Sequence, residues 1–159
     1  MPNILVAYFS ATGNTAKLAK NIASQIGADL FEIKPQQPYS SQDLNWQDKN
    51  SRSSLETKDT KSRPAISNEI TNLSQYNTIF VGFPIWWYEQ PRIIQTFLES
   101  YDFSGKTLIP FATSGSSGFG DTDQNLHAAC SPSTQWKPGK RFAGSGKTEI
   151  DNWIKTLGL

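Results

Sequence analysis

Apolar runs and amphipathic stretches alternate along this chain, a pattern typical of strands and helices that follow one another in βαβ units. Apolar runs at residues 4–9, 78–83 and 106–112 predict strands, and the second run is apolar enough for a central strand buried on both faces. An alternating run at 28–33 predicts a further strand. We place a fifth strand between 134 and 143, where the pattern is weakest.

Helical spacing of apolar residues predicts helices at 14–26 and 147–157. A further helix follows Pro91, which suits the first helical position because proline lacks only an N–H that would be unpaired there. Another helix begins near Asp121, which we expect to cap it. Five strands with intervening helices predict an α/β fold with a doubly wound, five-stranded parallel sheet, whose ligands bind beyond the carboxyl ends of the strands.

The segment from residue 35 to 67, the polar segment below, is rich in Ser, Asp, Asn and Lys. A structureless loop of that length is uncommon in a compact domain, so we expect it to be functional or partly helical. Its aromatic residues Tyr39 and Trp46 indicate that part of it packs down. We expect Trp46 to be a packing anchor rather than a cover for a ligand.

The composition fits one domain spanning residues 1–159, with 36% hydrophobic residues and a formal net charge of +1. That charge gives no electrostatic reason to expect nucleic acid or a membrane surface as a partner. Cys130 is the single cysteine and cannot form an internal disulfide, which suits a reducing compartment. No run approaches the roughly 18 apolar residues of a membrane span. We therefore expect a cytoplasmic protein, a monomer or a weak dimer.

A hydroxyl-rich turn joins the first predicted strand directly to the first predicted helix, and it consists of Ser10, Ala11, Thr12, Gly13, Asn14 and Thr15. Side-chain hydroxyls and backbone N–H groups at a helix N-terminus favour a bound phosphate. Gly13 permits the positive φ or close backbone approach that such a turn requires. The turn holds no Lys or Arg, so it predicts a terminal monophosphate held by neutral donors.

Two more unusual loops follow the third and fourth predicted strands. The aromatic loop consists of Pro84, Ile85, Trp86, Trp87 and Tyr88. The glycine loop, residues 113–120, includes Thr113, Ser114, Gly115, Gly118, Phe119 and Gly120. Together with the hydroxyl-rich turn, these loops match a planar aromatic cofactor that bears one phosphate.

Specific residues argue against other kinds of functional site. The chain has one histidine, His127, and one cysteine, so it offers no cluster of metal ligands. A receiver domain needs an acidic pair where Ser10 and Ala11 stand, and a low-molecular-weight phosphatase needs Arg where Trp136 follows Cys130. The run at 144–148 resembles part of a P-loop, but it better predicts the start of the last helix.

The hydroxyl-rich turn, the aromatic loop and the run at 97–106 together resemble the flavodoxin family. The likeness is closest to a bacterial branch that has a Trp-Trp loop, and it covers essentially the whole chain. It implies a strand order of 2-1-3-4-5 and noncovalently bound FMN. By this resemblance the phosphate is bound by Ser10, Thr12, Gly13, Asn14 and Thr15. One isoalloxazine face is covered by Trp86, Trp87 or Tyr88, and residues 113–120 line the other side or the pyrimidine edge.

The resemblance implies a low-potential electron carrier that works between partner proteins, a reductase and an acceptor. The flavin supplies the redox chemistry, so no residue is predicted to be catalytic. A second hypothesis is an NAD(P)H-dependent FMN or quinone reductase, with a substrate pocket bounded by the polar segment. A third is a binding module that kept the fold without the flavin. The chain is nearly neutral, so we do not assume the acidic docking face of many flavodoxins.

Overall fold

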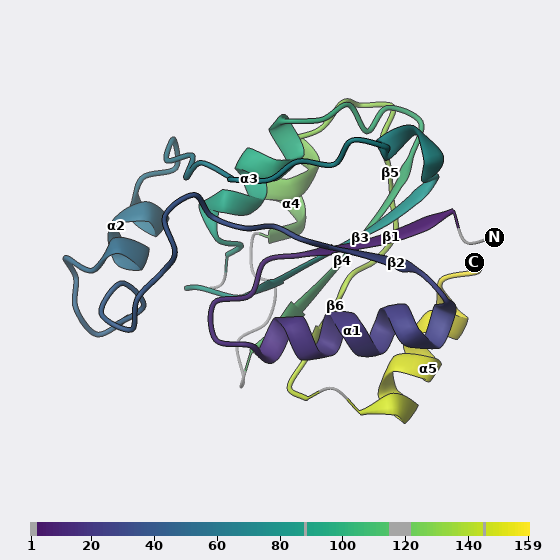
Figure 1. Cartoon of the computed structure of the whole chain (residues 1–159), viewed down its shortest axis with the longest axis horizontal. Helices are drawn as coiled ribbons and strands as arrows, with labels where there is room; N and C mark the ends of the chain where they lie inside the picture. The colour runs from purple at the N-terminus through teal and green to yellow at the C-terminus, as the bar shows by residue number, and fades with distance from the viewer. Residues whose placement is uncertain (1–2, 88, 115–121, 145) are drawn as a thin grey trace.

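A parallel β-sheet forms the middle of the molecule in the computed structural model, which describes residues 3–87, 89–114, 122–144 and 146–159 (Figure 1). Its strands are β1 (Ile4–Tyr8), β2 (Asp29–Glu32), β3 (Thr78–Pro84), β4 (Thr107–Thr113), β5 (Gln135–Trp136) and β6 (Lys140–Phe142). The order is β2-β1-β3-β4-β5, with β6 also paired to β4, and these pairings are all parallel. The predicted fold class and strand order are therefore confirmed.

The predicted fifth strand is two short strands rather than one. β5 pairs with β4 at Thr107 and Leu108, and β6 pairs with β4 from Phe111 onward. Pro110 lies between these two stretches and contributes to the division. The Leu108 carbonyl accepts from Lys137 on the β5 side, and alternate residues of a strand face the same neighbour, so the proline nitrogen also faces that side. Because it cannot donate there, the ladder breaks opposite it.

The helices are α1 (Asn14–Ile26), α2 (Arg52–Lys58), α3 (Arg92–Glu99), α4 (Thr122–Ala128) and α5 (Lys147–Thr156), with a short 3₁₀ turn η1 (Leu73–Gln75). The helices predicted at 14–26 and 147–157 are thus confirmed. Pro91 is the N-cap of α3 rather than its first residue, a difference of one position. The predicted cap Asp121 lies outside the described residues.

Two helical layers enclose the sheet. Figure 1 shows α1 and α5 on one face and α3 and α4 on the other. Each face has its own apolar cluster: Leu18 and Trp153 belong to the first, and Phe97 and Leu126 to the second. Within the described residues, no helix is long and apolar enough to cross a membrane.

The polar segment is folded around α2, which stands at the same end of the molecule as the start of α1 (Figure 1). The Arg52 guanidinium lies 3.8 Å from the centre of the Tyr39 ring and donates to the Glu56 carboxylate at 2.9 Å. The Tyr39 hydroxyl donates to Glu56, and burial together with this carboxylate raises the pKa of Tyr39. The expectation that Tyr39 packs down and that the segment is partly helical is confirmed.

The expectation that Trp46 is a packing anchor is wrong, because its side chain is 67% exposed. The surrounding chain, residues 40–51, is a series of turns with internal hydrogen bonds, such as that from Asp48 N–H to the Asn45 carbonyl, and it is joined to α2, where the Ser53 N–H donates to the Asp43 carbonyl. The segment is held by Tyr39, Arg52 and α2, and it does not need the indole for packing.

Candidate functional site

The three predicted loops meet at one edge of the sheet because their strands are neighbours. Tyr8 is in register with Gly82, and Pro84 is in register with Thr113, so β1, β3 and β4 end close together. The Thr15 and Thr113 hydroxyls are 2.7 Å apart, and the Ile85 N–H donates to the Thr113 carbonyl at 3.0 Å. The hydroxyl-rich turn, the aromatic loop and the start of the glycine loop are thereby joined.

The hydroxyl-rich turn opens α1 in the conformation that its glycine predicts. Gly13 is the N-cap residue, with a φ of 98°, and no side chain caps the helix there. Its own N–H donates to the Ser10 hydroxyl at 3.1 Å. The uncapped helix therefore leaves N–H groups of its first turn available to an anion, where the helix dipole is positive.

A cavity of about 400 Å³ lies where these loops meet, and it is lined by Thr12, Asn14, Lys17, Pro84, Thr113, Ser114, Ala143 and Gly144. Five of these residues come from the three predicted loops. The rest were not predicted: Ala143 and Gly144 follow β6, and Lys17 is one turn into α1. The Ser114 N–H donates to the Phe142 carbonyl at 3.2 Å, which fixes the end of β6 beside the glycine loop.

Lys17 changes the predicted electrostatics of the cavity. The turn itself has no basic residue, but the Lys17 side chain is exposed and lines the same cavity. The sequence contained the signal, since position 17 is one helical turn after Gly13, whose carbonyl accepts from the Lys17 N–H. An anion bound here would therefore meet one ammonium group as well as neutral donors.

The remaining residues of the turn are distributed differently. Thr15 is only 1% exposed, and its hydroxyl serves the link to Thr113. Ser10 and Ala11 line a separate cavity of about 430 Å³ beside Phe9 and Tyr39. The structure thus places the predicted turn residues on two adjacent hollows rather than one.

The two tryptophans of the aromatic loop have different environments. Trp86 is partly buried and packs edge-to-face on Phe9 and Tyr39, with ring centroids 5.9 and 5.6 Å away. Trp87 is 40% exposed and has a φ of 51°, in the left-handed region. The Trp86 and Glu89 backbones exchange two hydrogen bonds, of 2.9 and 3.0 Å, which close the loop as a tight turn. Trp87 is therefore the tryptophan with an open ring surface, and Ile85 packs against the core.

Five of the predicted cofactor-binding residues lie outside the described residues, namely Tyr88, Gly115, Gly118, Phe119 and Gly120. Their predicted contacts with a cofactor stay predictions.

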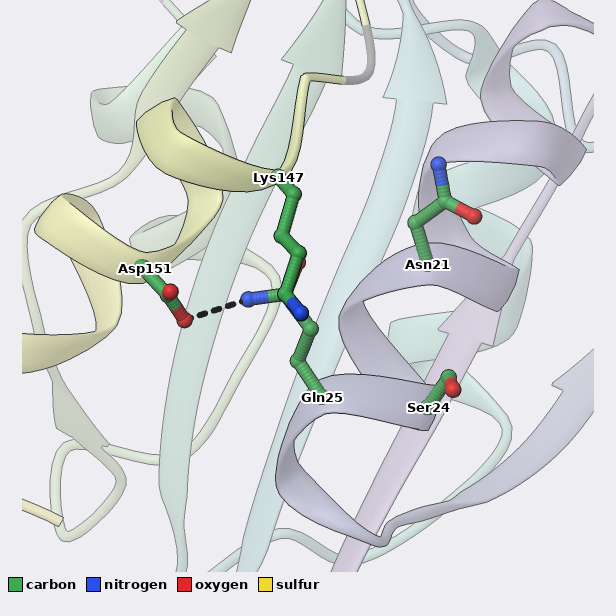
Figure 2. Close-up of a pocket in the computed structure, with 5 residues that line it drawn as sticks. All are labelled: Asn21, Ser24, Gln25, Lys147 and Asp151. Atoms are coloured by element: carbon green, nitrogen blue, oxygen red, sulfur yellow. Dashed lines mark hydrogen bonds between the residues drawn. The ribbon is translucent and has the colours of Figure 1, made fainter.

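A larger cavity, about 620 Å³, lies elsewhere, between α1 and α5 (Figure 2). It is lined by Asn21, Ser24, Gln25, Lys147 and Asp151, and Gln25 donates to the Asp151 carboxylate. This groove has no aromatic side chain and lies apart from the strand ends. It therefore offers nothing to a planar cofactor, whatever its size.

The groups that could carry other chemistry are inert or scattered. Burial raises the pKa of the Cys130 thiol to about 11, so the thiol stays protonated and unreactive near neutral pH. His127 is exposed and packs on Trp136, with ring centroids 4.6 Å apart. Among the described residues, no group of three or more His, Cys, Asp or Glu could hold a metal ion.

Known structures share this architecture over essentially the whole chain. Two candidate flavoproteins, from Bacteroides eggerthii DSM 20697 and Bacteroides uniformis ATCC 8492, are 45% and 48% identical, each with a TM-score of 0.92. The alignments cover 98% and 97% of this chain and 98% of each of those chains. A flavoprotein from Lactobacillus acidophilus NCFM, solved in complex with FMN, is 19% identical with a TM-score of 0.76 over 100% of both chains, which shows the common fold.

No curated protein matches this chain. A family model described as flavodoxin matches residues 3–157, which is nearly all of the sequence. The sheet order, the uncapped start of α1 and the cavity at the strand ends agree with that match. The chain therefore belongs to the flavodoxin family.

Proposed function

We propose that this protein binds FMN noncovalently at the strand-end edge and carries electrons with it. The observation that supports this most is the cavity of about 400 Å³ at the start of α1, lined by all three predicted loops. Membership in the flavodoxin family supports FMN as the cofactor. The relative from Lactobacillus acidophilus was itself solved with FMN.

The described residues fit the phosphate end of FMN. The N-terminus of α1 has no side-chain cap, so its first-turn N–H groups are free to bind phosphate oxygens. Thr12 and Asn14 add polar side chains, and Lys17 adds a positive charge. A phosphate dianion would then meet donors on several sides without a buried countercharge. Trp87 has the exposed ring surface that an isoalloxazine face would need.

Bound FMN would supply the redox chemistry, and the chain would set its environment. We propose that the protein exchanges electrons with a reductase and an acceptor protein in the cytoplasm, as a monomer or a weak dimer. With a formal net charge of +1, it is not expected to bind nucleic acid or a membrane surface. Lys17 offsets part of the phosphate charge. We therefore expect it to lessen the decrease in the flavin reduction potential that an anion held by neutral donors alone would cause.

The second candidate is an NAD(P)H-dependent FMN or quinone reductase. It is favoured by a cavity between the polar segment and Trp87, where a small redox substrate could bind. A carrier needs no such cavity, because its partners are proteins that reach the flavin edge.

The test is visible absorption of the purified protein after incubation with FMN and removal of the free cofactor. A retained flavin band that NADPH bleaches only after a flavodoxin reductase is added supports the carrier. Rapid bleaching by NADPH alone supports the reductase instead. A protein that retains no flavin contradicts both functions.

A further inference from the structure

A cavity of about 390 Å³ lies between the polar segment and the aromatic loop, within the size range of small-molecule sites. It is lined by Trp46, Lys49, Ser54, Thr57, Lys58, Thr60, Trp87, Glu89 and Arg92. None of these lines the proposed phosphate cavity. The polar segment thus builds a second hollow beside Trp87.

Two tryptophans give this cavity flat aromatic walls. Trp46 is 67% exposed and Trp87 is 40% exposed, and they are the only tryptophans among the large exposed hydrophobic residues of the described chain. An exposed indole in a turn of polar residues contributes little to folding, as the wrong packing prediction for Trp46 shows. Two such indoles on one cavity provide surfaces on which a planar ring can stack.

The charges around the cavity favour an anion. Lys49, Lys58 and Arg92 provide three cations against the single carboxylate of Glu89. Glu89 is already occupied, since its Oε1 accepts from Arg92 Nη1 at 3.1 Å and from Asn125 Nδ2 at 3.1 Å. Two lysines therefore remain as surplus positive charge.

Two residues that line the cavity also carry buried polar atoms without a hydrogen-bond partner among the described residues. The Arg92 side chain is 2% exposed; its Nη2 donates to the Thr57 carbonyl at 2.6 Å, but its Nε has no hydrogen-bond partner among the described residues. The buried Thr57 hydroxyl likewise lacks one. Because both atoms are themselves buried, they do not reach into the cavity, and the tryptophans and lysines determine what it can bind.

We propose that this cavity binds a planar aromatic compound carrying a negative charge, such as a carboxylate or a sulfonate. The ring stacks on Trp46 and on the side of Trp87 that lines this cavity, which leaves the other side of the Trp87 indole for the flavin, and Lys49 and Lys58 neutralise the anion. This assignment goes beyond FMN binding, because it uses residues that do not line the phosphate cavity.

The test uses anthraquinone-2-sulfonate as the charged probe and 2-(hydroxymethyl)anthraquinone as a neutral comparator of the same ring system. Binding is measured by isothermal titration calorimetry on FMN-saturated protein, so that the probe cannot simply occupy the cofactor site. We expect the sulfonate to bind with at least about fivefold higher affinity than the neutral compound, because only the sulfonate gains from the lysines.

Variants locate the binding. Trp46→Ala should weaken both probes about tenfold, as expected for the loss of one stacking surface. The double variant Lys49→Gln/Lys58→Gln should remove the preference for the sulfonate and leave the neutral probe unchanged. Lys61→Gln is the matched control, because this exposed lysine lies in the same segment but does not line the cavity. It should change neither affinity.

Absence of sulfonate binding, or sulfonate binding that survives both the Trp46 and the double lysine changes, would overturn the proposal. These results are separate from those on FMN, because calorimetry detects the probe whether or not the flavin exchanges electrons. A protein that retains no flavin can be titrated in the same way, and its dependence on Trp46 and the two lysines still decides the question.

Discussion

At the scale of single residues, Gly13 is required because of its backbone conformation, and not because a side chain would lack space there. A side chain at this position would meet nothing within 4 Å, but the φ of 98° is one that L-residues with a Cβ adopt at a cost. We expect Gly13→Ala to lower the free energy of unfolding by about 1 kcal/mol and to weaken FMN binding, because the turn would shift. Urea denaturation and FMN titration measure the two effects.

Gly146→Ala is the control for that strain. Gly146 is also a helix N-cap with open space around it, but its φ is −64°. Its replacement should change stability by no more than about 0.5 kcal/mol. Equal losses from both substitutions would show that the positive φ of Gly13 does not matter.

Thr15 connects two loops, and that connection can be tested separately. Its hydroxyl, buried and 2.7 Å from that of Thr113, is lost in Thr15→Val with little change in volume. The valine variant should bind FMN about tenfold more weakly, because Thr113 loses its partner and the loops are free to separate. Thr15→Ser keeps the hydroxyl and should stay within about twofold of the wild type. Quenching of FMN fluorescence measures both affinities, and a serine variant as weak as the valine variant would contradict this account.

Residue-level chemistry could be predicted where it depends on neighbours in sequence. The strand, turn and helix around Gly13 are contiguous, so the hydroxyl-rich turn was recognisable without a structure. Lys17 was missed because it lies outside the contiguous turn, although it follows Gly13 by one helical turn. Trp46 was assigned wrongly because hydrophobicity alone does not show whether an apolar partner is within reach.

At the scale of elements, the pairing of β3 and β4 depends on a contact between a glycine and a ring. Gly82 is in register with Phe111, and a Cβ on Gly82 would overlap the buried Phe111 ring. That ring also packs near Phe80 and Trp153, so it has little freedom to move. We expect Gly82→Ala to lower the free energy of unfolding by about 2 kcal/mol, measured by urea denaturation.

The double-mutant cycle with Phe111→Leu identifies the cause. Leucine leaves room beside position 82, so Gly82→Ala should cost less than half as much in the leucine background. An unchanged cost in that background would mean that lost backbone geometry, rather than the overlap with the ring, destabilises the strand.

Periodicity predicted the elements well, except at the far edge of the sheet. The helices at 14–26 and 147–157 have apolar faces that repeat regularly, and the structure has them within one residue of those bounds. The division into β5 and β6 depends in part on Pro110, which lies on a different strand. The prediction of one strand also overlooked Pro138 and Gly139, a pair typical of turns, which lie between β5 and β6.

At the scale of the whole molecule, the topology brings the three loops together. β1, β3 and β4 are adjacent and parallel, so loops from positions 10, 84 and 113 reach one edge although they are far apart in sequence. The rule for doubly wound sheets predicted this edge as the site. The rule says nothing about the polar segment, whose fold over Trp87 depends on long-range contacts such as the ion pair between Arg63 and Glu99 at 2.9 Å.

If the start of α1 binds the phosphate, FMN should stabilise the whole fold far more than riboflavin, which lacks that group. A ligand at about 100 times its dissociation constant adds about 2.7 kcal/mol to the free energy of unfolding, which for a chain of this size raises Tm by about 5–10 °C. Riboflavin at the same concentration should raise Tm by less than about 2 °C, because the helix N-terminus and Lys17 gain nothing from it. Differential scanning calorimetry of the apoprotein with each compound gives the comparison. Equal shifts would place the binding energy in the ring contacts and contradict a phosphate site at the hydroxyl-rich turn.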